Sequence, residues 1–357
     1  MAIEVWATGI SHVEWAPAAA ARAEAEGFDG MVVVDSQNLS GDPFVALALA
    51  ARETSRLRLG TGVTNPATRH PAAVAAAIAS VQVASSGRAV LGVGRGDSAL
   101  AHLGIAPAPL SDLERFVRVT RAYLRGEHVA FDELRAYERE GARSIDVLRL
   151  ADRPLDSQLH WLPQDLPPVP VEVVATGPKA LAVAGEQADR TLLAVGADPE
   201  RVAYAADVAR KAGAQRIGAF VNVVAHPDVA IARQVSVGGL TTFARFSAMD
   251  GTVPTPIDKP SERVLQEVHQ AYDMRHHTRA GSPQAGRLTN EFIDRFGIVG
   301  PPDHCVRRLS HLAAIGIDRF IVVGPSIDSD REQARASMQT FTHEVLPAVK
   351  EVTLGVM

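Results

Sequence analysis

The sequence predicts an α/β fold of the (β/α)8 or TIM-barrel type, built as one domain with insertions. Short apolar runs alternate along the chain with alanine-rich helical patterns, which is typical of βαβ units and a parallel sheet. Runs such as 32–34 and 89–91 lack polar alternation, as strands buried on both faces should. Eight runs of this kind can be counted, the number that such a barrel needs.

The competing architecture is an open, doubly wound sheet. Its dinucleotide-binding forms carry a GxGxxG motif after the first strand, where this chain has Ile10, Ser11 and His12 instead. The barrel is therefore favoured.

The expected elements follow one another in a regular order. Strands are expected at 3–7, 31–34, 57–63, 89–93, 171–175, 191–195, 216–224 and 319–323. Helices are expected at 17–26, 43–54, 71–84, 178–186, 199–212 and 301–315, with a helical tail at 328–349.

Two segments interrupt this order. Residues 126–170 are first charged and then rich in proline, which predicts an insertion or long loop. Residues around 226–300 are expected to form a helical insertion, broken near 251–260 and 281–283. We expect the first insertion and residues 243–282 to cover the substrate pocket.

Composition excludes several classes of partner. The net charge is −5 and the basic residues are scattered, so neither a nucleic acid nor a membrane is expected as a partner. The N-terminal segment is expected to be a strand rather than a signal peptide, since it has no basic region or long apolar run. Cys305 is the only cysteine, which suits a reducing cytoplasm, and we expect it to pack at a helix start.

Glycines and polar residues gather where four of the expected strands end, at 35–38, 60–66, 92–98 and 175–179. In a barrel these ends and the loops after them form the active site. Glycine lets a ligand approach the backbone closely. Gly60 and Gly62 therefore indicate either a bulge or the close approach of a ligand. The glycines of 92–97, among them Gly94 and Gly96, would let a planar ring press on the backbone, and the alternative for this loop is a tight turn.

The loop after the fifth strand has the composition of an anion site. Thr176 is predicted to cap a helix, Gly177 allows close approach and Pro178 suits the first turn. Free N–H groups of that turn, with the charge of Lys179, would attract a phosphate. The alternative is an ordinary capped helix with a solvated lysine.

Other residues at the rim also have simpler explanations. Asp35 would otherwise cap the turn that follows it, and Arg95 and Asp97 would pair with each other. His70 precedes Pro71 and is expected to anchor a helix start.

No metal site is expected. His276 and His277 are adjacent, so their side chains diverge by about 100° on a helix, and a solvated face is the expectation. Glu14 and Trp15, at the start of the first helix, are candidates for lining the pocket.

Longer motifs carry a family resemblance that covers nearly the whole chain. Residues 59–66 (LGTGVTNP) with 68–71 (TRHP), and residues 86–98 (SGRAVLGVGRGDS), strongly resemble F420-dependent members of the luciferase-like superfamily. Residues 175–179 (ATGPK) are similar to methylenetetrahydromethanopterin reductases, and 292–302 with 316–320 look like the family's final βα region. Arg190 departs from the glycine that relatives commonly carry there.

The resemblance implies a non-prolyl cis peptide at Gly62–Val63 that backs the central ring of the deazaflavin, and a cofactor phosphate near the fifth-strand loop. Asp35, Asp97 and His12 are the candidate catalytic residues, with Asp97 or His12 exchanging a proton. The candidate cofactor-binding residues are Asn38, Gly62, Val63, Thr64, Gly94, Arg95, Gly96, Ser98, Ala175, Thr176, Gly177, Pro178 and Lys179.

The function that follows is that of an F420-dependent oxidoreductase. It would transfer a hydride between the deazaflavin C5 and a small carbonyl, imine, activated alkene, alcohol or nitroaromatic. The alternative is an FMN-dependent monooxygenase that uses reduced flavin and O2, and a third class is a relative that only binds a ligand. The resemblance also implies a homodimer or a larger homo-oligomer.

Overall fold

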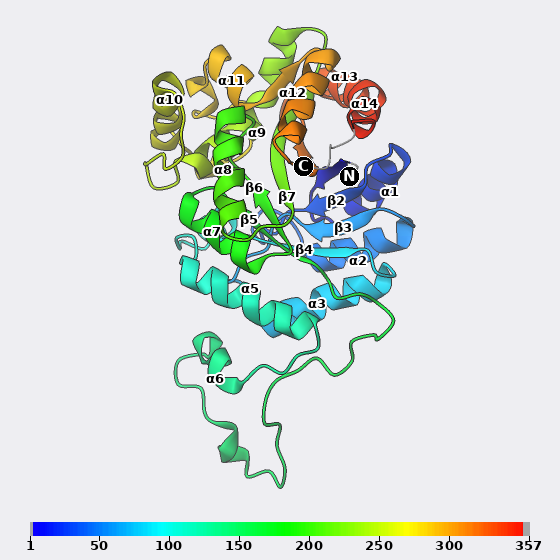
Figure 1. Cartoon of the computed structure of the whole chain (residues 1–357), viewed down its shortest axis with the longest axis vertical. Helices are drawn as coiled ribbons and strands as arrows, with labels where there is room; N and C mark the ends of the chain where they lie inside the picture. The colour runs from blue at the N-terminus through cyan, green and yellow to red at the C-terminus, as the bar shows by residue number, and fades with distance from the viewer. Residues whose placement is uncertain (1–2, 353–357) are drawn as a thin grey trace.

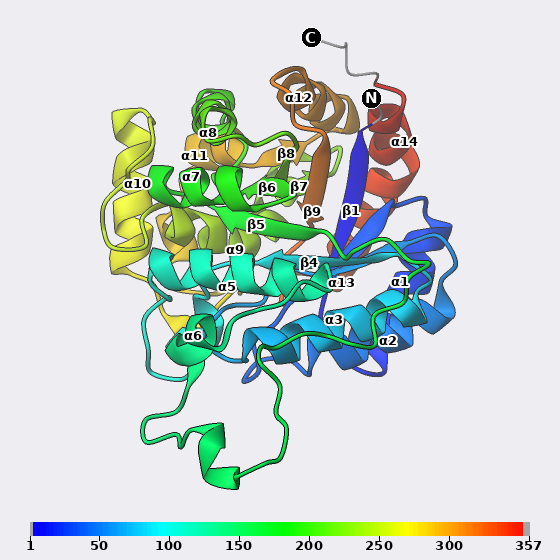
Figure 2. The same cartoon turned by 60° about the horizontal axis from the view of Figure 1, so that its bottom comes forward.

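Eight parallel strands close into a barrel in this computed structural model, which describes residues 3–352 (Figures 1 and 2). Their order around the barrel is β1, β2, β3, β4, β5, β6, β7, β9, and β9 pairs with β1 to close it. The strands are β1 Glu4–Gly9, β2 Gly30–Val33, β3 Arg58–Thr61, β4 Ala89–Val93, β5 Val171–Ala175, β6 Arg190–Leu193, β7 Ile217–Ala225 and β9 Arg319–Val323. The predicted barrel is confirmed.

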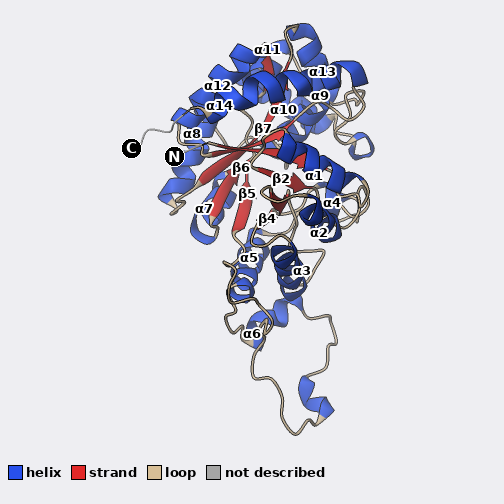
Figure 3. Cartoon of the chain, turned by 90° about the vertical axis from the view of Figure 1, so that its right-hand side faces the viewer, coloured by secondary structure: helices blue, strands red, loops and turns tan. Residues whose placement is uncertain are grey.

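Helices cover the outside of the barrel (Figure 3). They are α1 Trp15–Ala25, α2 Pro43–Glu53, α3 Pro71–Ala84, α4 Ser98–Ala101, α5 Leu110–Leu124, α7 Pro178–Gln187, α8 Pro199–Lys211, α12 Pro302–Ala314, α13 Arg331–Thr340 and α14 Leu346–Lys350. A further short helix, α6 Phe131–Leu134, belongs to the first insertion. Asp42 caps α2 and Asp198 caps α8. Each aspartate stands directly before a proline, and its side chain accepts hydrogen bonds from two backbone N–H groups of the first helical turn. Cys305 is buried in the first turn of α12, as predicted.

The predicted helical tail is confirmed, since α13, a π-helical turn at Phe341–Val345 and α14 follow one another without a gap. One expectation about the elements needs correction. The second insertion contains not only helices but also a short strand, β8 Ile298–Gly300, which pairs with the far end of β7. Its helices are α9 Val229–Ser247, α10 Lys259–Gln270 and α11 Asn290–Phe296, with short 3-10 turns at Met274–His276 and Ala285–Arg287.

Helix α9 lies against the carboxyl end of the barrel. Its Phe243 ring packs 6.0 Å from Phe220 of β7. A Cβ on Gly239 would lie 2.6 Å from Asn222 of β7, so the helix backbone touches the strand here. The barrel interior and α9 therefore share one apolar cluster, which includes Trp6, Val32, Leu192 and Leu240.

A buried ion cluster fills the opposite end of the barrel. Arg319 donates to Glu4 at 2.7 Å and to Glu172 at 2.6 Å, and Arg190 donates to Glu172 at 3.3 Å. The Arg319 guanidinium also stacks 4.0 Å from the Trp6 ring. These residues lie at the amino ends of β1, β5, β6 and β9, so Arg190 is remote from the predicted site.

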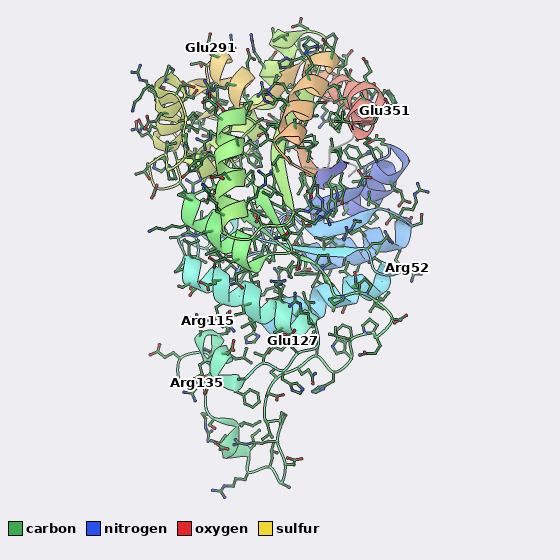
Figure 4. The ribbon with its side chains drawn as sticks, viewed as in Figure 1. Arg52, Arg115, Glu127, Arg135, Glu291 and Glu351 are labelled. Carbon is green, nitrogen blue, oxygen red and sulfur yellow. The ribbon has the colours of Figure 1, made fainter. Side chains whose placement is uncertain are left out.

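The first insertion forms an arm that projects from the body, with Arg135 and Glu127 near its base (Figures 1 and 4). It contains α6 and 3-10 turns at Arg135–Tyr137 and Ile145–Leu148. The pictures show most of it extending away from the barrel, whereas we expected it to cover the pocket. Within residues 3–352, no helix combines the length and the hydropathy needed to cross a membrane.

Candidate active site

Asp35 lies buried directly after β2, with one oxygen satisfied and the other not. Its Oδ2 accepts from Thr64 Oγ1 at 2.7 Å and from Arg69 Nη1 at 2.6 Å. Its Oδ1 is buried and has no hydrogen-bond partner within the described residues. A buried carboxylate oxygen is costly to leave unpaired, so this atom is free to accept a hydrogen bond from a bound ligand or from water.

The Arg69 guanidinium connects that carboxylate to a helix. It also contacts Asp42 at 3.0 Å, and Asp42 caps α2. The turn that follows Asp35 closes through backbone bonds to the Ser36 carbonyl, so the suggested capping role of Asp35 is wrong. Asp35 is instead half of an ion pair that joins the β2 and β3 loops.

The Gly62–Val63 peptide after β3 is cis, as the resemblance implies. Both residues are half-buried, so part of this backbone faces outward at the rim. The Thr64 N–H donates to Gly92 O at 3.0 Å, and Gly94 donates to Thr64 O at 2.8 Å. A Cβ on Gly94 would come 2.8 Å from Val63 Cγ2, so only glycine fits beside the bulge. The β3 and β4 ends therefore form one surface.

The β4 loop makes contacts other than those the sequence suggests. Arg95 donates to the Ala108 carbonyl at 2.7 Å and does not pair with Asp97. Asp97 instead pairs through both oxygens with Arg245 of α9, at 3.0 and 2.5 Å. Gly96 adopts φ +78°, and Ser98 Oγ lies 3.1 Å from Ser36 Oγ. This ion pair makes Asp97 an anchor for α9 rather than a free acid.

One prediction for the β5 loop is wrong, and the first turn of α7 has no side-chain cap. Thr176 does not cap α7, because its hydroxyl donates to the Ala194 carbonyl at 3.3 Å. The N-cap is Gly177, and no side chain caps the first turn. Gly177 and Pro178 are half-buried after the buried Ala175, and Lys179 is exposed. Donor groups and a positive charge therefore meet at this part of the rim.

His12 and Asn38 lie at the outer edge of the rim. The His12 ring stacks on Trp15 with 4.1 Å between centroids, and its Nδ1 accepts from the Glu14 N–H at 3.3 Å. Asn38 is exposed and accepts from Gln37 at 3.1 Å. Within residues 3–352, no hydrogen bond or ring contact joins either side chain to Asp35 or to the cis peptide, so they form the periphery of the site.

Sequence reasoning missed a polar group contributed by the second insertion. Arg245 stacks on Tyr272, 4.9 Å from its ring centroid, and the Tyr272 hydroxyl lies 2.7 Å from His277 Nδ1. The expectation of a solvated His277 is wrong, since its side chain is half-buried and hydrogen-bonded to Tyr272. Burial lowers the pKa of this imidazole to about 4. His276 is exposed and bonds to Asp273 at 2.8 Å. His70 caps α3 by accepting from Ala72, as predicted.

Two shallow cavities lie away from this rim. One of about 190 Å³ is lined by Pro170 and Asp189, just before β5 and β6. The other, of about 360 Å³, is lined by Asp29, just before β2. Both belong to the amino end of the barrel. Among the described residues, no group of three or more histidine, cysteine or carboxylate side chains is arranged to hold a metal ion.

The barrel, the cis peptide and the rim at the carboxyl ends of the strands define an α/β-barrel protein with a candidate ligand site at the strand ends. The family model described as "Luciferase-like monooxygenase" matches residues 5–319. The chain belongs to this family.

Curated relatives of two kinds cover most of the chain. The chain is 28% identical over 350 residues to a 5,10-methylenetetrahydromethanopterin reductase of Methanolobus tindarius, covering 87% of this chain and 90% of the relative. It is 26% identical over 345 residues to an F420-dependent glucose-6-phosphate dehydrogenase of Intrasporangium calvum, covering 92% of each. These names support the predicted class of oxidoreductase.

A solved structure agrees with the fold. The F420-dependent tetrahydromethanopterin reductase of Methanopyrus kandleri superposes with a TM-score of 0.69 at 22% identity, covering 97% of this chain and 99% of that chain. The likeness extends over the barrel and both insertions, since nearly all of each chain is matched.

Proposed function

We propose that this protein is an F420-dependent oxidoreductase that transfers a hydride between the deazaflavin and a small organic substrate. The observation that carries the proposal is the rim itself, where the half-exposed Gly62–Val63 cis peptide lies beside the β4 glycines. F420, when bound, supplies a carbon that gives or takes a hydride, and the protein supplies orientation and polar contacts.

The residues present fit such a cofactor. Gly62 and Val63 offer backbone surface for a flat ring, and Asp35 Oδ1 offers an unpaired acceptor for an N–H or O–H group. The uncapped first turn of α7, with Gly177 and Lys179, offers donors and a charge for a phosphate. The Thr64 hydroxyl donates a hydrogen bond to Asp35 Oδ2 and so fixes the position of the carboxylate.

Titration of the purified protein with F420, and separately with FMN, tests the proposal. Binding should be detected as a change in cofactor fluorescence, with F420 bound more tightly than FMN. Micromolar binding of FMN without binding of F420 would contradict the proposal and favour the monooxygenase alternative.

Lys179→Ala should weaken F420 binding by up to about fivefold, because an exposed cation near an anion contributes up to about 1 kcal/mol. The loss should shrink at high salt, where the charge is screened. Lys211→Ala is the matched control, since Lys211 lies at the far end of α8 and pairs with Asp207. Equal affinities of the two variants would show that the phosphate is not held at α7.

Gly62→Val is not a clean test of the ring site. A Cβ at Gly62 would lie 2.6 Å from Val32 Cγ2 inside the barrel, so the variant would disturb packing before it disturbed binding.

We also propose that the protein is a homodimer or larger homo-oligomer. Large apolar side chains are exposed on the arm, including Leu148, Leu150 and Leu155, and exposed apolar patches are common at interfaces. Light scattering coupled to size exclusion measures the mass directly, and a monomer at micromolar concentration would contradict the proposal.

A further inference from the structure

The Tyr272–His277 pair has no part in the cofactor site described above. A continuous set of contacts links it to the cis peptide. Val63 packs on Gly94, the same loop carries Asp97, Asp97 binds Arg245, and Arg245 stacks on Tyr272. The pair is therefore held above the β4 end of the rim, on the insertion that covers it.

Three contacts fix the orientation of the tyrosine ring. Its face meets the Arg245 guanidinium at 4.9 Å, its hydroxyl lies 2.7 Å from His277 Nδ1, and it packs against the apolar cluster of the barrel interior and α9. The Arg245 side chain is itself held by two bonds to Asp97. A side chain restrained in this way loses little conformational entropy when a ligand binds, so the tyrosine is preorganised for binding.

The pair carries no charge at neutral pH. Burial lowers the pKa of His277 to about 4, with Arg245 and His102 acting in the same direction and Asp97 opposing them. Burial also raises the pKa of the Tyr272 hydroxyl well above its usual value. Imidazole and phenol therefore both stay neutral, joined by one hydrogen bond.

A neutral tyrosine–histidine pair can reverse its polarity without gaining or losing a proton overall. When the Tyr272 hydroxyl donates to Nδ1, the imidazole proton lies on Nε2, which can donate to a carbonyl oxygen. When Nδ1–H donates to the tyrosine oxygen, Nε2 becomes an acceptor for an alcohol hydroxyl. The same pair thus matches both members of a carbonyl–alcohol couple.

The surroundings disfavour a charged substrate at this point. The Phe243 and Phe246 rings pack with 5.5 Å between their centroids, and Tyr272 and Phe246 both pack against the apolar cluster that contains Phe243. The Arg245 charge is already matched by Asp97. Burying a phosphate here would leave its charge without a free counter-ion.

A second polar atom at this place lacks a partner. His102 ends α4 in the β4 loop, is close enough to His277 to influence its pKa, and has a buried Nε2 without a hydrogen bond within the described residues. Such an atom indicates a missing polar neighbour.

We propose that the Tyr272–His277 pair binds the reacting oxygen of an uncharged carbonyl compound and of the alcohol derived from it, with Arg245 and Asp97 as positioning residues. This inference rests on the proposed function. It gives that function a substrate class distinct from a sugar phosphate.

Probe binding to the F420-loaded protein tests this substrate class. The uncharged probes are acetone, cyclohexanone, 2-propanol and cyclohexanol, and glucose 6-phosphate is the anionic probe, each followed by the change in deazaflavin fluorescence. At least one uncharged probe should bind more tightly than glucose 6-phosphate. Binding of glucose 6-phosphate alone, or of none of these probes, would overturn the inference.

Tyr272→Phe and His277→Gln test the pair itself. Each should weaken binding of the uncharged probe by about tenfold, the effect of one lost hydrogen bond. The F420 affinity and the thermal midpoint of the loaded protein should not change, and in turnover KM should rise more than kcat falls. Tyr123→Phe is the matched control, because it removes a hydroxyl bonded to Ser157 at 2.7 Å near the arm.

Unchanged probe affinity in both variants would overturn the inference while leaving F420 binding intact. Loss of F420 binding by the wild-type protein would instead contradict the proposed function. A variant that unfolds is recognised by circular dichroism, and the probe affinity of the other variant then tests the inference.

Discussion

An arginine neutralises each of the two acids at the rim. Arg69 reaches Asp35 from the β3 loop, and Arg245 reaches Asp97 from α9. The first pair leaves one carboxylate oxygen unbonded, whereas the second uses both oxygens of Asp97. Asp35 is therefore the acid with capacity for a ligand, and Asp97 holds the covering helix.

Asp97→Asn should destabilise the protein by about 3 kcal/mol, because Arg245 would stay largely buried without its counter-ion. Urea unfolding measures the loss. The double variant Asp97→Asn with Arg245→Met should recover part of it, since no unpaired charge remains.

Asp303→Asn is the control for this pair, because Asp303 forms an exposed ion pair with Arg307 and its removal should change little. If Asp97→Asn and Asp303→Asn have the same small effect, Asp97 does not anchor α9.

The residues at the strand ends could be predicted, whereas their partners could not. Asp35 and the rim glycines follow apolar runs directly, so position in the barrel identifies them. Arg245 lies 148 residues from Asp97, and Tyr272 and His277 lie in a segment without a motif. Only the path of α9 across the rim brings them together.

Among the elements, the arm is the one least attached to the barrel. Its base is tied by backbone bonds between Val129 and Ser157 and by the bond from Tyr123 to Ser157. Beyond that base, the hydrogen bonds and ion pairs that the structure shows for residues 138–155 stay within 135–155. The tip therefore contributes little to the stability of the barrel.

Replacing residues 138–155 by a short Gly-Ser linker should leave the thermal midpoint of the monomer within about 2 °C of the wild-type monomer, since no barrel contact is lost. Both proteins are compared at concentrations where they are monomeric, because association through the arm would raise the wild-type midpoint. Differential scanning calorimetry measures the midpoint. Removing 127–158 is the comparison, because it deletes the tie at the base and should lower the midpoint more. A collapse of the fold after removal of the tip alone would contradict this assignment.

Helices and strands were predicted correctly where the local sequence pattern alone determines the secondary structure. Continuous apolar runs predicted β4, β5 and β9 with their observed bounds. The helical pattern of residues 71–84 predicted α3 with its observed bounds. The three-residue strand β8 was missed because so short a run has no period. The helical tail was predicted, but not the π-helical turn within it at Phe341–Val345, because these residues have the pattern of an ordinary helix.

At the scale of the molecule, the ion cluster at the amino end joins the first and last strands of the barrel. Burial pushes the pKa of Glu4 upward, but Arg319 and Arg190 outweigh it and lower that pKa from 4.5 to about 2. Glu4 therefore stabilises the fold above about pH 4.5, and this contribution disappears as the pH falls toward 2.

Glu4→Gln should remove this pH dependence. The difference in unfolding free energy between wild type and variant should shrink by about 3 kcal/mol between neutral pH and pH 2. Urea unfolding across this range measures it. Glu291→Gln, at an exposed position (Figure 4), is the control. A difference that stays constant with pH would contradict the assignment.

Closure of the barrel by β1 and β9 also sets an order of events during protein synthesis. Glu4 and Arg319 are 315 residues apart, so β1 leaves the ribosome long before its second neighbour exists. At 5–20 residues per second the delay is roughly 15–60 s. Until then the nascent chain carries an unpaired strand edge, a hazard for aggregation. A chaperone that shields this edge would act before residue 319 is made, and any nonsense mutation upstream of it would leave the sheet open.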